Sequence, residues 1–410
     1  MSGRIQTPRG TFDVLGDEAL AREELERAAK DIFERAGYAR IETPAFEATE
    51  LFARGVGEST DVVQKEMYTF DGGGGDSFTL RPEGTAPVCR AYVEHGMHKL
   101  AQPVKLWYLG PYFRAERPQH GRYRQFAQVG VEAIGSDDPA VDAETILLLA
   151  ELIEALRVQA RLRIGSLGTP ATRADYRDEL QQYLRAHEDR LSQEVRDRID
   201  LNPLRAFDTD HRGTQEVMAD APVLLDRLTD EDREHFETVR RLLDGSGLAY
   251  EVDPALVRGL DYYTRTVFEF SSDALGAQSG VGGGGRYDGL IEQLGGPPTP
   301  GMGWAAGVER LLLAAEPQPT APAPVDLYVA YAKPEYRADA FKLAADARRA
   351  GQSALLELGG RSLKGQLKQA DRTGARYVAI LGDEGTALKD MESGEQRTVE
   401  TDTVMHHIRR

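Results

Sequence analysis

A proline-rich segment, EPQPTAPAP at 316–324, divides this chain of 410 residues into two parts of unequal length. Four of its nine residues are proline. Each proline fixes φ and removes a backbone donor, so such a segment favours extended polyproline II over a helix or strand. We therefore expect 316–324 to be a linker between domains.

The segment after the linker, 325–410, alternates strand-like apolar runs with amphipathic helical patterns. The expected order is strand 326–331, helix 334–350, strand 353–357, helix 362–373 and strand 376–381. Strands separated by helices at this spacing are typical of βαβ units. The tail is therefore predicted to be a small α/β domain with a parallel or mixed sheet.

The part before the linker has strand-rich segments on both sides of charged amphipathic helices. We predict an α+β core in two pieces, 1–165 and 253–315, interrupted by a helical insertion at 166–252. Within the first piece, the aromatic-rich runs 105–113 and 124–134 flank the polar stretch AERPQHGRY, a pattern that predicts a long β-hairpin.

Charge and cysteine content limit the class of protein. The 50 basic and 67 acidic residues give a net charge of −17, so a polyanionic partner would have to meet local arginine clusters. The single cysteine, Cys89, excludes a disulfide framework and a cysteine-based zinc site. Because we find neither a membrane-length apolar run nor an apolar leader, we expect a cytoplasmic protein.

The hairpin carries a cluster of charged residues: Arg114, Glu116, Arg117, Arg122 and Arg124. An arginine at a rigid strand end, such as Arg114, can hold a phosphate bidentately, and arginines on the loop can reach a larger polyanion. The alternative is a loop that is simply charged and solvated.

Two acids lie where burial is expected, Glu83 directly after a strand and Glu132 within the apolar run QVGVEAIG. A buried carboxylate is costly unless it is paired or contacts a ligand. An ammonium or imidazole ligand would supply such a partner, and so would a structural salt bridge with a strand arginine. The sequence leaves both open.

Glycine-rich segments near the linker point to close backbone contact with a ligand. In SGVGGGGRYDGL the glycines permit such an approach, but the strand–helix setting of a dinucleotide motif and a Walker lysine are both missing. Arg258 precedes Gly259 at a strand entry, and Arg310 lies on the first turns of a predicted helix after a glycine-rich strand.

Taken in order, these segments resemble the histidyl-tRNA synthetases, a family of class II aminoacyl-tRNA synthetases, nearly from end to end. The resemblance begins at TPRGTFDVL (7–15). The region around Pro44 is similar to class II motif 1, FRAERPQHGRYRQFAQ to motif 2 and GVER to motif 3. LVRGLDYYTRTVFE and GGGGRYDGL are similar to the histidine-specific signatures.

The resemblance implies a mostly antiparallel sheet flanked by helices, with an anticodon-binding domain at 325–410. It implies activation of L-histidine with ATP to histidyl-adenylate and pyrophosphate, then transfer of the histidyl group to the 3′ end of tRNA(His). Mg²⁺ would enter bound to ATP, with no metal site formed by the protein alone. Motif 1 implies a homodimer.

The resemblance also implies residue roles. Arg114 would hold the α-phosphate, Arg310 the γ-phosphate, and Arg258 would face the reacting carboxylate and the α-phosphate, so Arg258 and Arg114 are the expected catalytic residues. The histidine-binding residues would be Glu83, Thr85, Gln128, Glu132, Arg258, Tyr262, Tyr263 and Tyr287. The residues approaching the tRNA acceptor end would be Arg117, Gln119, Arg122 and Arg124.

Two alternatives stay open. One is the catalytically inactive, histidine-binding regulatory subunit of ATP phosphoribosyltransferase, a relative that tends to lose the histidine-specific arginine and the anticodon domain. The other is a class II synthetase for another amino acid, which RGLDYY and GGGGRYDGL disfavour. The general base of the transfer step is not evident, and a phosphate oxygen of the adenylate is one candidate.

Overall fold

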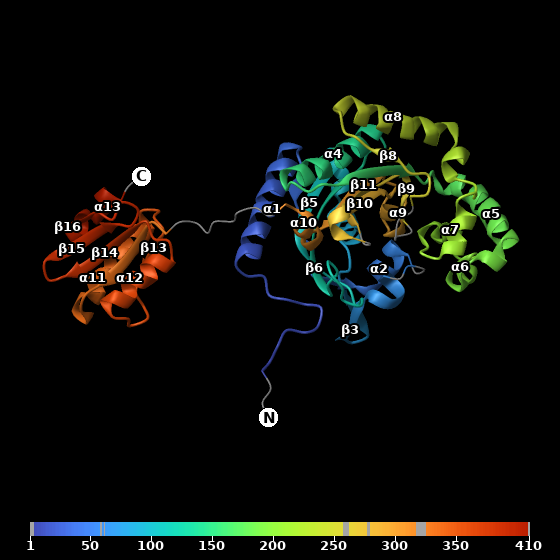
Figure 1. The fold of residues 1–410 in the computed structure, drawn as a ribbon. Helices are drawn as coiled ribbons and strands as arrows, with labels where there is room; N and C mark the ends of the chain where they lie inside the picture. Colours follow the sequence, from blue (N-terminus) through green and yellow to red (C-terminus); the bar gives the residue numbers. More distant parts are fainter. Residues whose placement is uncertain are drawn as a thin grey trace. The chain divides into compact units, whose positions relative to one another are not determined.

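A computed structural model describes residues 4–57, 60, 62–256, 262–276, 279–316 and 325–408. The chain forms two compact units, Met1–Gln318 and Pro319–Arg410, which divide within the proline-rich segment (Figure 1). Among the helices in these ranges, none combines the length and the apolar character that a membrane crossing requires.

The first unit is built on an eight-stranded sheet of order β1-β5-β6-β11-β10-β9-β7-β8. The strands are β1 Ala39–Arg40, β5 Val104–Phe113, β6 Gln125–Ile134, β7 Arg161–Ser166, β8 Glu251–Val252, β9 Thr264–Ser271, β10 Gly280–Arg286 and β11 Gly301–Gly307. The six strands from β5 to β7 pair antiparallel, whereas β1 and β8 join the two edges in parallel. The fold class is therefore α+β, as predicted, and β5 and β6 form the predicted hairpin.

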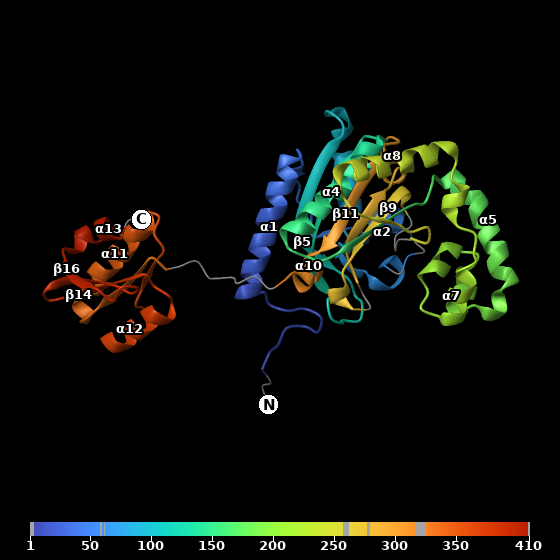
Figure 2. The ribbon, with the colours of Figure 1, turned by 45° about the horizontal axis from the view of Figure 1, so that its top comes forward.

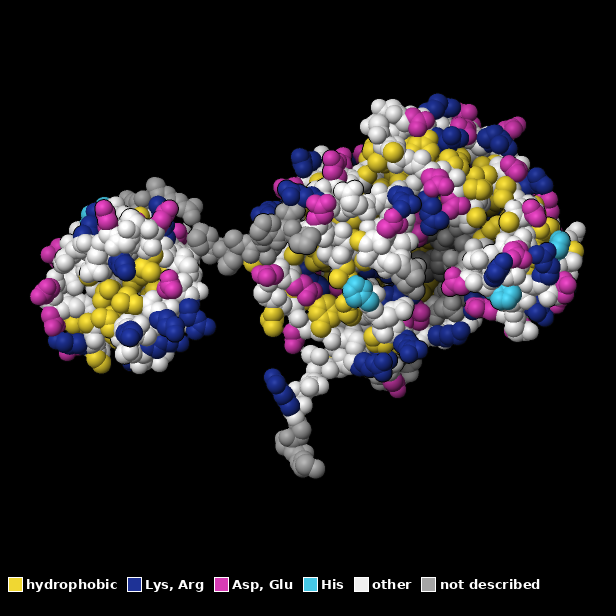
Figure 3. All heavy atoms as spheres, viewed as in Figure 1, with side chains coloured by type: hydrophobic (Ala, Val, Ile, Leu, Met, Phe, Trp, Pro, Cys, Tyr) yellow, Lys and Arg dark blue, Asp and Glu magenta, His cyan; other side chains and the backbone are white. Residues whose placement is uncertain are grey.

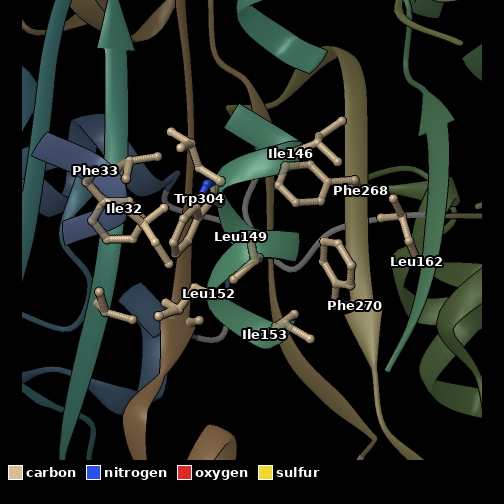
Figure 4. Close-up of a cluster of buried hydrophobic side chains, with 14 of the residues drawn as sticks. Ile32, Phe33, Ile146, Leu149, Leu152, Ile153, Leu162, Phe268, Phe270 and Trp304 are labelled. Carbon is tan, nitrogen blue, oxygen red and sulfur yellow. The ribbon is translucent and has the colours of Figure 1, made fainter. Parts of the chain in front are cut away.

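One face of this sheet is covered by helices. They are α1 Asp17–Arg35, α4 Pro139–Ala155, α8 Asp230–Ser246 and α10 Val308–Ala314. Helix α4 begins where Asp138 accepts a hydrogen bond from the Ala140 amide with proline in the first turn, and it runs across the sheet. Figure 4 shows Ile146 and Leu149 of α4 among Trp304 and Phe268 of the strands.

Strand alternation assigns the two faces of β6 different tasks. Val129, Val131 and Ala133 belong to the apolar core under the helices. Successive side chains point to opposite sides of a strand, so Gln128 and Glu132 lie on the other face. That face holds the candidate site.

The α-helices between β7 and β8 fall within 166–252, the range expected for a helical insertion. They are α5 Pro170–Ala186, α6 Gln193–Arg198, α7 Arg212–Met218 and α8. The first three lie beside the sheet in both views (Figures 1 and 2). Helix α8 instead packs on the main core through Phe236, Val239 and Leu243, and it ends at Gly247, which has φ 78°. The insertion is therefore joined to the core by its last helix.

A smaller antiparallel sheet of order β2-β4-β3 and three short helices complete the first unit. Their bounds are β2 Phe46–Ala48, β3 Tyr68–Gly73, β4 Asp76–Leu80, α2 Thr49–Val56, α3 Thr85–Glu94 and α9 Leu290–Gln293. The glycine run 72–75 lies at the tip of the β3–β4 hairpin.

The second glycine run, 282–285, does not separate strands. It lies inside β10, in the middle of the sheet. A Cβ on Gly284 would lie 2.0 Å from the carbonyl oxygen of Gly303. One on Gly285 would lie 2.9 Å from the Tyr263 ring. Close approach of the neighbouring strand and of an aromatic ring explains why these positions are glycine.

The second unit is a five-stranded sheet of order β13-β12-β14-β15-β16 with helices on both faces. Its elements are β12 Leu327–Tyr331, α11 Arg337–Arg349, β13 Ala354–Leu356, α12 Leu363–Arg372, β14 Tyr377–Gly382, β15 Gly385–Asp390, β16 Gln396–Val399 and α13 Val404–His407. Strands β13, β12 and β14 are parallel as predicted, whereas the antiparallel β15 and β16 were not predicted from the sequence.

Candidate active site

A cavity of about 140 Å³ opens beside the β5–β6 hairpin, where the hairpin meets the β11–α10 junction. Its lining residues are Arg114, Glu116, Gly121, Arg122, Tyr123, Phe126, Gln128, Gly307, Glu309 and Arg310. Segments nearly 200 positions apart in the sequence therefore supply three guanidinium groups to one cavity. Such a concentration of cations favours a polyanionic ligand.

Each of two arginines is held by a backbone carbonyl. Arg114 donates from Nε to the Pro82 oxygen at 3.0 Å and lies 5.3 Å from the centroid of the Phe126 ring. Arg310 donates from Nε to the Gly280 oxygen at 2.6 Å. Burial, and next the nearby charge of Arg122, lower the pKa of Arg310. A bound anion would offset both effects.

Glu309, the neighbour of Arg310, joins three elements. Its two carboxylate oxygens accept the Ala127 amide of β6 at 3.0 and 3.1 Å, and Oε1 also accepts Arg22 Nη2 of α1 at 2.8 Å. The start of α10, which carries Arg310, is thereby fixed to β6. Next to Ala127, the buried Oε1 of Gln128 has no hydrogen-bond partner within the described part of the chain, so a ligand donor could fill this place.

Farther along the same face of β6, three hydroxyls surround the buried carboxylate of Glu132. Thr85 and Tyr108 donate to Oε1 at 2.7 and 3.2 Å, and Tyr287 donates to Oε2 at 2.6 Å. Burial raises the pKa of Glu132 to about 8, although these hydrogen bonds oppose the shift. The sequence left open a salt bridge between Glu132 and a strand arginine. Within the described residues, no arginine is among the hydrogen-bond donors to Glu132.

Glu83 lies beside this pocket and caps helix α3. Its carboxylate accepts the backbone amides of Thr85 and Ala86 at 2.7 and 2.9 Å. Burial raises the pKa of Glu83, while these two hydrogen bonds and the charge of Arg114 act against the increase. The pocket can therefore offer two carboxyl groups to a cationic ligand.

Aromatic rings close the pocket. Tyr262 and Tyr263 are buried with ring centroids 4.7 Å apart, and the Tyr262 ring stands at 78° to the ring of Tyr287, 6.0 Å away. Six of the eight predicted histidine-binding residues thus come together in this pocket: Glu83, Thr85, Glu132, Tyr262, Tyr263 and Tyr287.

The two groups of residues are connected along β6. Gln128 and Glu132 are four residues apart on one face, a separation of about 13 Å at the rise of an antiparallel strand. Gly130 lies between them, where a Cβ would be 2.5 Å from the Tyr108 hydroxyl. A small amphoteric molecule could therefore span from the cationic cavity to the carboxylate pocket.

Other predicted residues lie elsewhere. Arg117 and Gln119 are exposed on the hairpin loop outside the cavity lining. Arg124 holds the N-terminal segment, since its amide donates to the Gly10 oxygen at 2.8 Å. Of the loop residues assigned to tRNA, Arg122 lines the cavity and also pairs with Glu116 at 3.3 Å. Arg258 lies outside the described residues.

Sequence reasoning missed several residues of this site. Tyr108 reaches Glu132 from the partner strand of the hairpin, where it faces Gly130 in register. Gly301 and Gly303 make room for the site, because a Cβ there would lie 2.1 Å from the Tyr287 ring and 1.8 Å from Glu132 Oε2, respectively. The hairpin pairing and the glycines of GMGW are the only signals for them.

The described residues contain no cluster of three or more His, Cys, Asp or Glu side chains arranged for a metal ion.

The face shown in Figure 3 has no large region of a single charge sign, because basic and acidic side chains intermingle there. Recognition of an anion by this chain would therefore be local.

Comparison with known proteins gives consistent results over both units. A profile described as histidyl-tRNA synthetase matches residues 10–311, and one described as anticodon binding domain matches residues 326–410. Proteins named histidine–tRNA ligase from Desulforamulus reducens and Halorhodospira halophila are each 49% identical, the first over 96% of both chains, the second over 98% of this chain and 97% of its own.

Solved structures agree. The crystal structure of apo histidyl-tRNA synthetase from S. aureus matches with a TM-score of 0.82 and 35% identity, covering 99% of this chain and 100% of that one. A Bacillus halodurans structure, whose name combines an ATP phosphoribosyltransferase regulatory subunit with histidyl-tRNA synthetase, has a TM-score of 0.67 at 22% identity over 93% of this chain and 100% of its own, which shows a common fold.

Proposed function

This chain belongs to the histidyl-tRNA synthetase family, and from that premise we propose how its residues carry out histidine–tRNA ligation. The overall reaction joins L-histidine to the 3′ end of tRNA(His) through a histidyl-adenylate made with ATP. One observation carries the proposal: the cavity of Arg114 and Arg310 adjoins the pocket of Glu132 on a single face of the sheet.

In the activation step, a carboxylate oxygen of histidine attacks the α-phosphorus of ATP, and the bond to the leaving pyrophosphate breaks. Arg114 faces the α-phosphate and Arg310 the γ-phosphate, with ATP entering as its Mg²⁺ complex. Their guanidiniums are held by backbone carbonyls before substrate arrives. Pre-aimed cations of this kind stabilise charge that develops on the phosphate oxygens in the transition state.

Arg258 completes the catalytic group in this proposal. Its position before Gly259 in LVRGLDYY carries the assignment, which rests on the sequence alone. It would face the histidine carboxylate and the α-phosphate together. Gln128, whose buried Oε1 has no partner in the described residues, would accept a hydrogen bond from the substrate's amino group.

Specificity for histidine arises in the Glu132 pocket. Glu132 would hold one imidazole nitrogen and Tyr263 the other, while Glu83 and Thr85 hold the amino group. A phenylalanine or leucine side chain offers no hydrogen-bond partner to Glu132 or to Tyr263. Each buried polar group that loses its ligand partner in this way costs about 1–3 kcal/mol. The regulatory-subunit alternative is not better supported by the comparisons, because the chain also matches the anticodon binding domain.

The transfer step requires tRNA(His) at the same cleft. Arg117, Gln119, Arg122 and Arg124 of the hairpin loop would approach the acceptor end, and the second unit would bind the anticodon, where unstacked bases are read. We also infer a cytoplasmic homodimer formed around Pro44. The exposed rings of Phe46 and Phe70, 5.8 Å apart on the small sheet, support an interface there.

The test is ATP–pyrophosphate exchange with each of the protein amino acids in turn, followed by charging of tRNA(His). Exchange should depend on histidine and on Mg²⁺. Equal exchange with another amino acid, or histidine binding with no exchange, would contradict the proposal.

A further inference from the structure

We propose that the buried ionic chain His235–Asp142–Arg286 positions Tyr287, and through it Glu132, and so ties the helical insertion to the affinity of the site for histidine. The inference rests on the proposed function of the Glu132 pocket. None of the three residues contacts the pocket directly, so they are positioning residues.

Arg286 is the centre of the chain. Its guanidinium is completely buried, and every nitrogen has a partner: Nε meets Asp142 Oδ1 at 2.8 Å, Nη1 meets Asp288 Oδ1 at 2.8 Å, and Nη2 donates to the Ser136 oxygen at 2.9 Å. A planar fork with three fixed acceptors has one orientation. The end of β10 is therefore locked in place.

Tyr287 follows directly, with its side chain on the opposite face of the sheet. Its hydroxyl donates to Glu132 Oε2 at 2.6 Å, and its ring rests on Gly301. Asp288, on the other side of Tyr287, accepts the Gly301 amide at 3.2 Å. Both neighbours of Tyr287 are thus fixed, and a shift of either would move the hydroxyl that orients Glu132.

Asp142 extends the chain into the insertion. It lies on α4 with an exposed fraction of 0%, and its second oxygen, Oδ2, lies 2.8 Å from Nε2 of His235 on α8. Helix α8 is the part of the insertion that packs on the main core. A displacement of α8 would act on Oδ2 of Asp142, and Oδ1 of the same carboxylate holds Arg286.

Stability alone is a poor explanation for this arrangement. Burying an ion pair costs desolvation free energy, which the attraction between the two charges offsets only when the geometry is ideal. Apolar residues of similar volume are often as stabilising. Buried ionic groups are better at defining one geometry than at adding stability. Here the geometry defined is that of the strand end that carries Tyr287.

The test measures KM for histidine and for ATP in the exchange reaction of the full chain. His235→Ala should raise KM for histidine about 3- to 10-fold and leave kcat and KM for ATP within about twofold, because Glu132 lies at the substrate's imidazole, away from the reacting atoms. His235→Gln, which keeps a nitrogen near the position of Nε2, should restore the wild-type KM. Asp142→Asn, which keeps the side-chain shape, should raise KM for histidine at least as far as His235→Ala does.

Val239→Ala is the matched control. Val239 lies on α8, one turn from His235, is 0% exposed and packs in the apolar core. It should lower the melting temperature without changing KM for histidine. Equal changes in the two KM values, or a rise in KM for histidine with Val239→Ala, would overturn the inference. So would an unchanged KM for histidine in both His235→Ala and Asp142→Asn. Absence of histidine-dependent exchange in the wild type would instead refute the proposed function.

Discussion

Gly303 of β11 pairs in register with Glu132 of β6, and a Cβ on Gly303 would lie 1.8 Å from Glu132 Oε2. The same Cβ would lie 2.6 Å from the carbonyl oxygen of Val131, which cannot move without distorting the strand. The space above Gly303 is thus filled by the carboxylate of Glu132. The glycine is a requirement of the pocket rather than of a turn.

Gly303→Ala is therefore expected to displace Glu132 and to destabilise the fold by about 1–3 kcal/mol, the range for added volume in a packed site. Gly245→Ala is the control. Gly245 lies on helix α8, and a Cβ at this position would meet nothing within 4 Å. It should stabilise the protein by up to about 1 kcal/mol. The melting temperature and the KM for histidine are measured for both variants. Equal changes of these two quantities in Gly303→Ala and Gly245→Ala would contradict the role of Gly303 in the pocket.

Glu132→Gln keeps the shape of the side chain but cannot ionise when an imidazole binds. Loss of a charged hydrogen-bond partner for the imidazole should raise KM for histidine about 10- to 100-fold, with KM for ATP within about twofold. Exchange kinetics with each substrate varied in turn supply the comparison. Equal losses for the two substrates would show that Glu132 does not face the imidazole.

The raised pKa of Glu132 predicts a pH dependence of stability. Its pKa is about 8 in the folded chain against an ordinary 4.5, so the native state holds a proton that the unfolded state has released between these values. The contribution of Glu132 to stability is fully present below 4.5 and is lost as pH rises through about 8. Glu83, whose pKa is also raised, acts in the same direction.

Without ligand, the melting temperature of the wild type should fall more steeply from about pH 5 to about pH 8 than that of Glu132→Gln. Differential scanning calorimetry of both proteins measures the two slopes. Parallel curves would mean that Glu132 is ionised throughout this range in the folded state.

Deletion of 325–410 tests the role of the second unit. This unit has its own apolar clusters, so its removal should leave the first unit folded. Histidine-dependent exchange should persist, while the kcat/KM for charging tRNA(His) should fall at least about 10-fold. Unchanged charging efficiency would exclude tRNA recognition by this unit.

The sequence predicts those features that depend on local pattern. The hairpin of β5 and β6, the helices of the insertion and the first strands of the tail follow from apolar periodicity and from turn residues. Arg114 and Arg310 could be assigned to one cavity only through the family resemblance. Their spacing in the sequence alone does not predict that a strand end and a helix start lie close together in the fold.

The rest depends on contacts between distant parts of the chain. Arg286 and Asp142 are 144 positions apart, and Tyr108 meets Glu132 through strand pairing. The glycines of β10 do not indicate a strand in the sequence, because glycine disfavours strands unless a neighbouring residue needs the space. Helix α8 has the same charged pattern as the other insertion helices, yet its apolar stripe packs on the core.

The central claim, that Arg114 and Arg310 together bind the triphosphate, is tested most directly by histidine-dependent ATP–pyrophosphate exchange in single variants. Arg114→Ala and Arg310→Ala should each lower kcat/KM at least about 100-fold. Arg117→Ala, an exposed arginine on the same hairpin but outside the cavity lining, should leave exchange within about twofold. Exchange near the wild-type rate in either Arg114→Ala or Arg310→Ala would contradict the account.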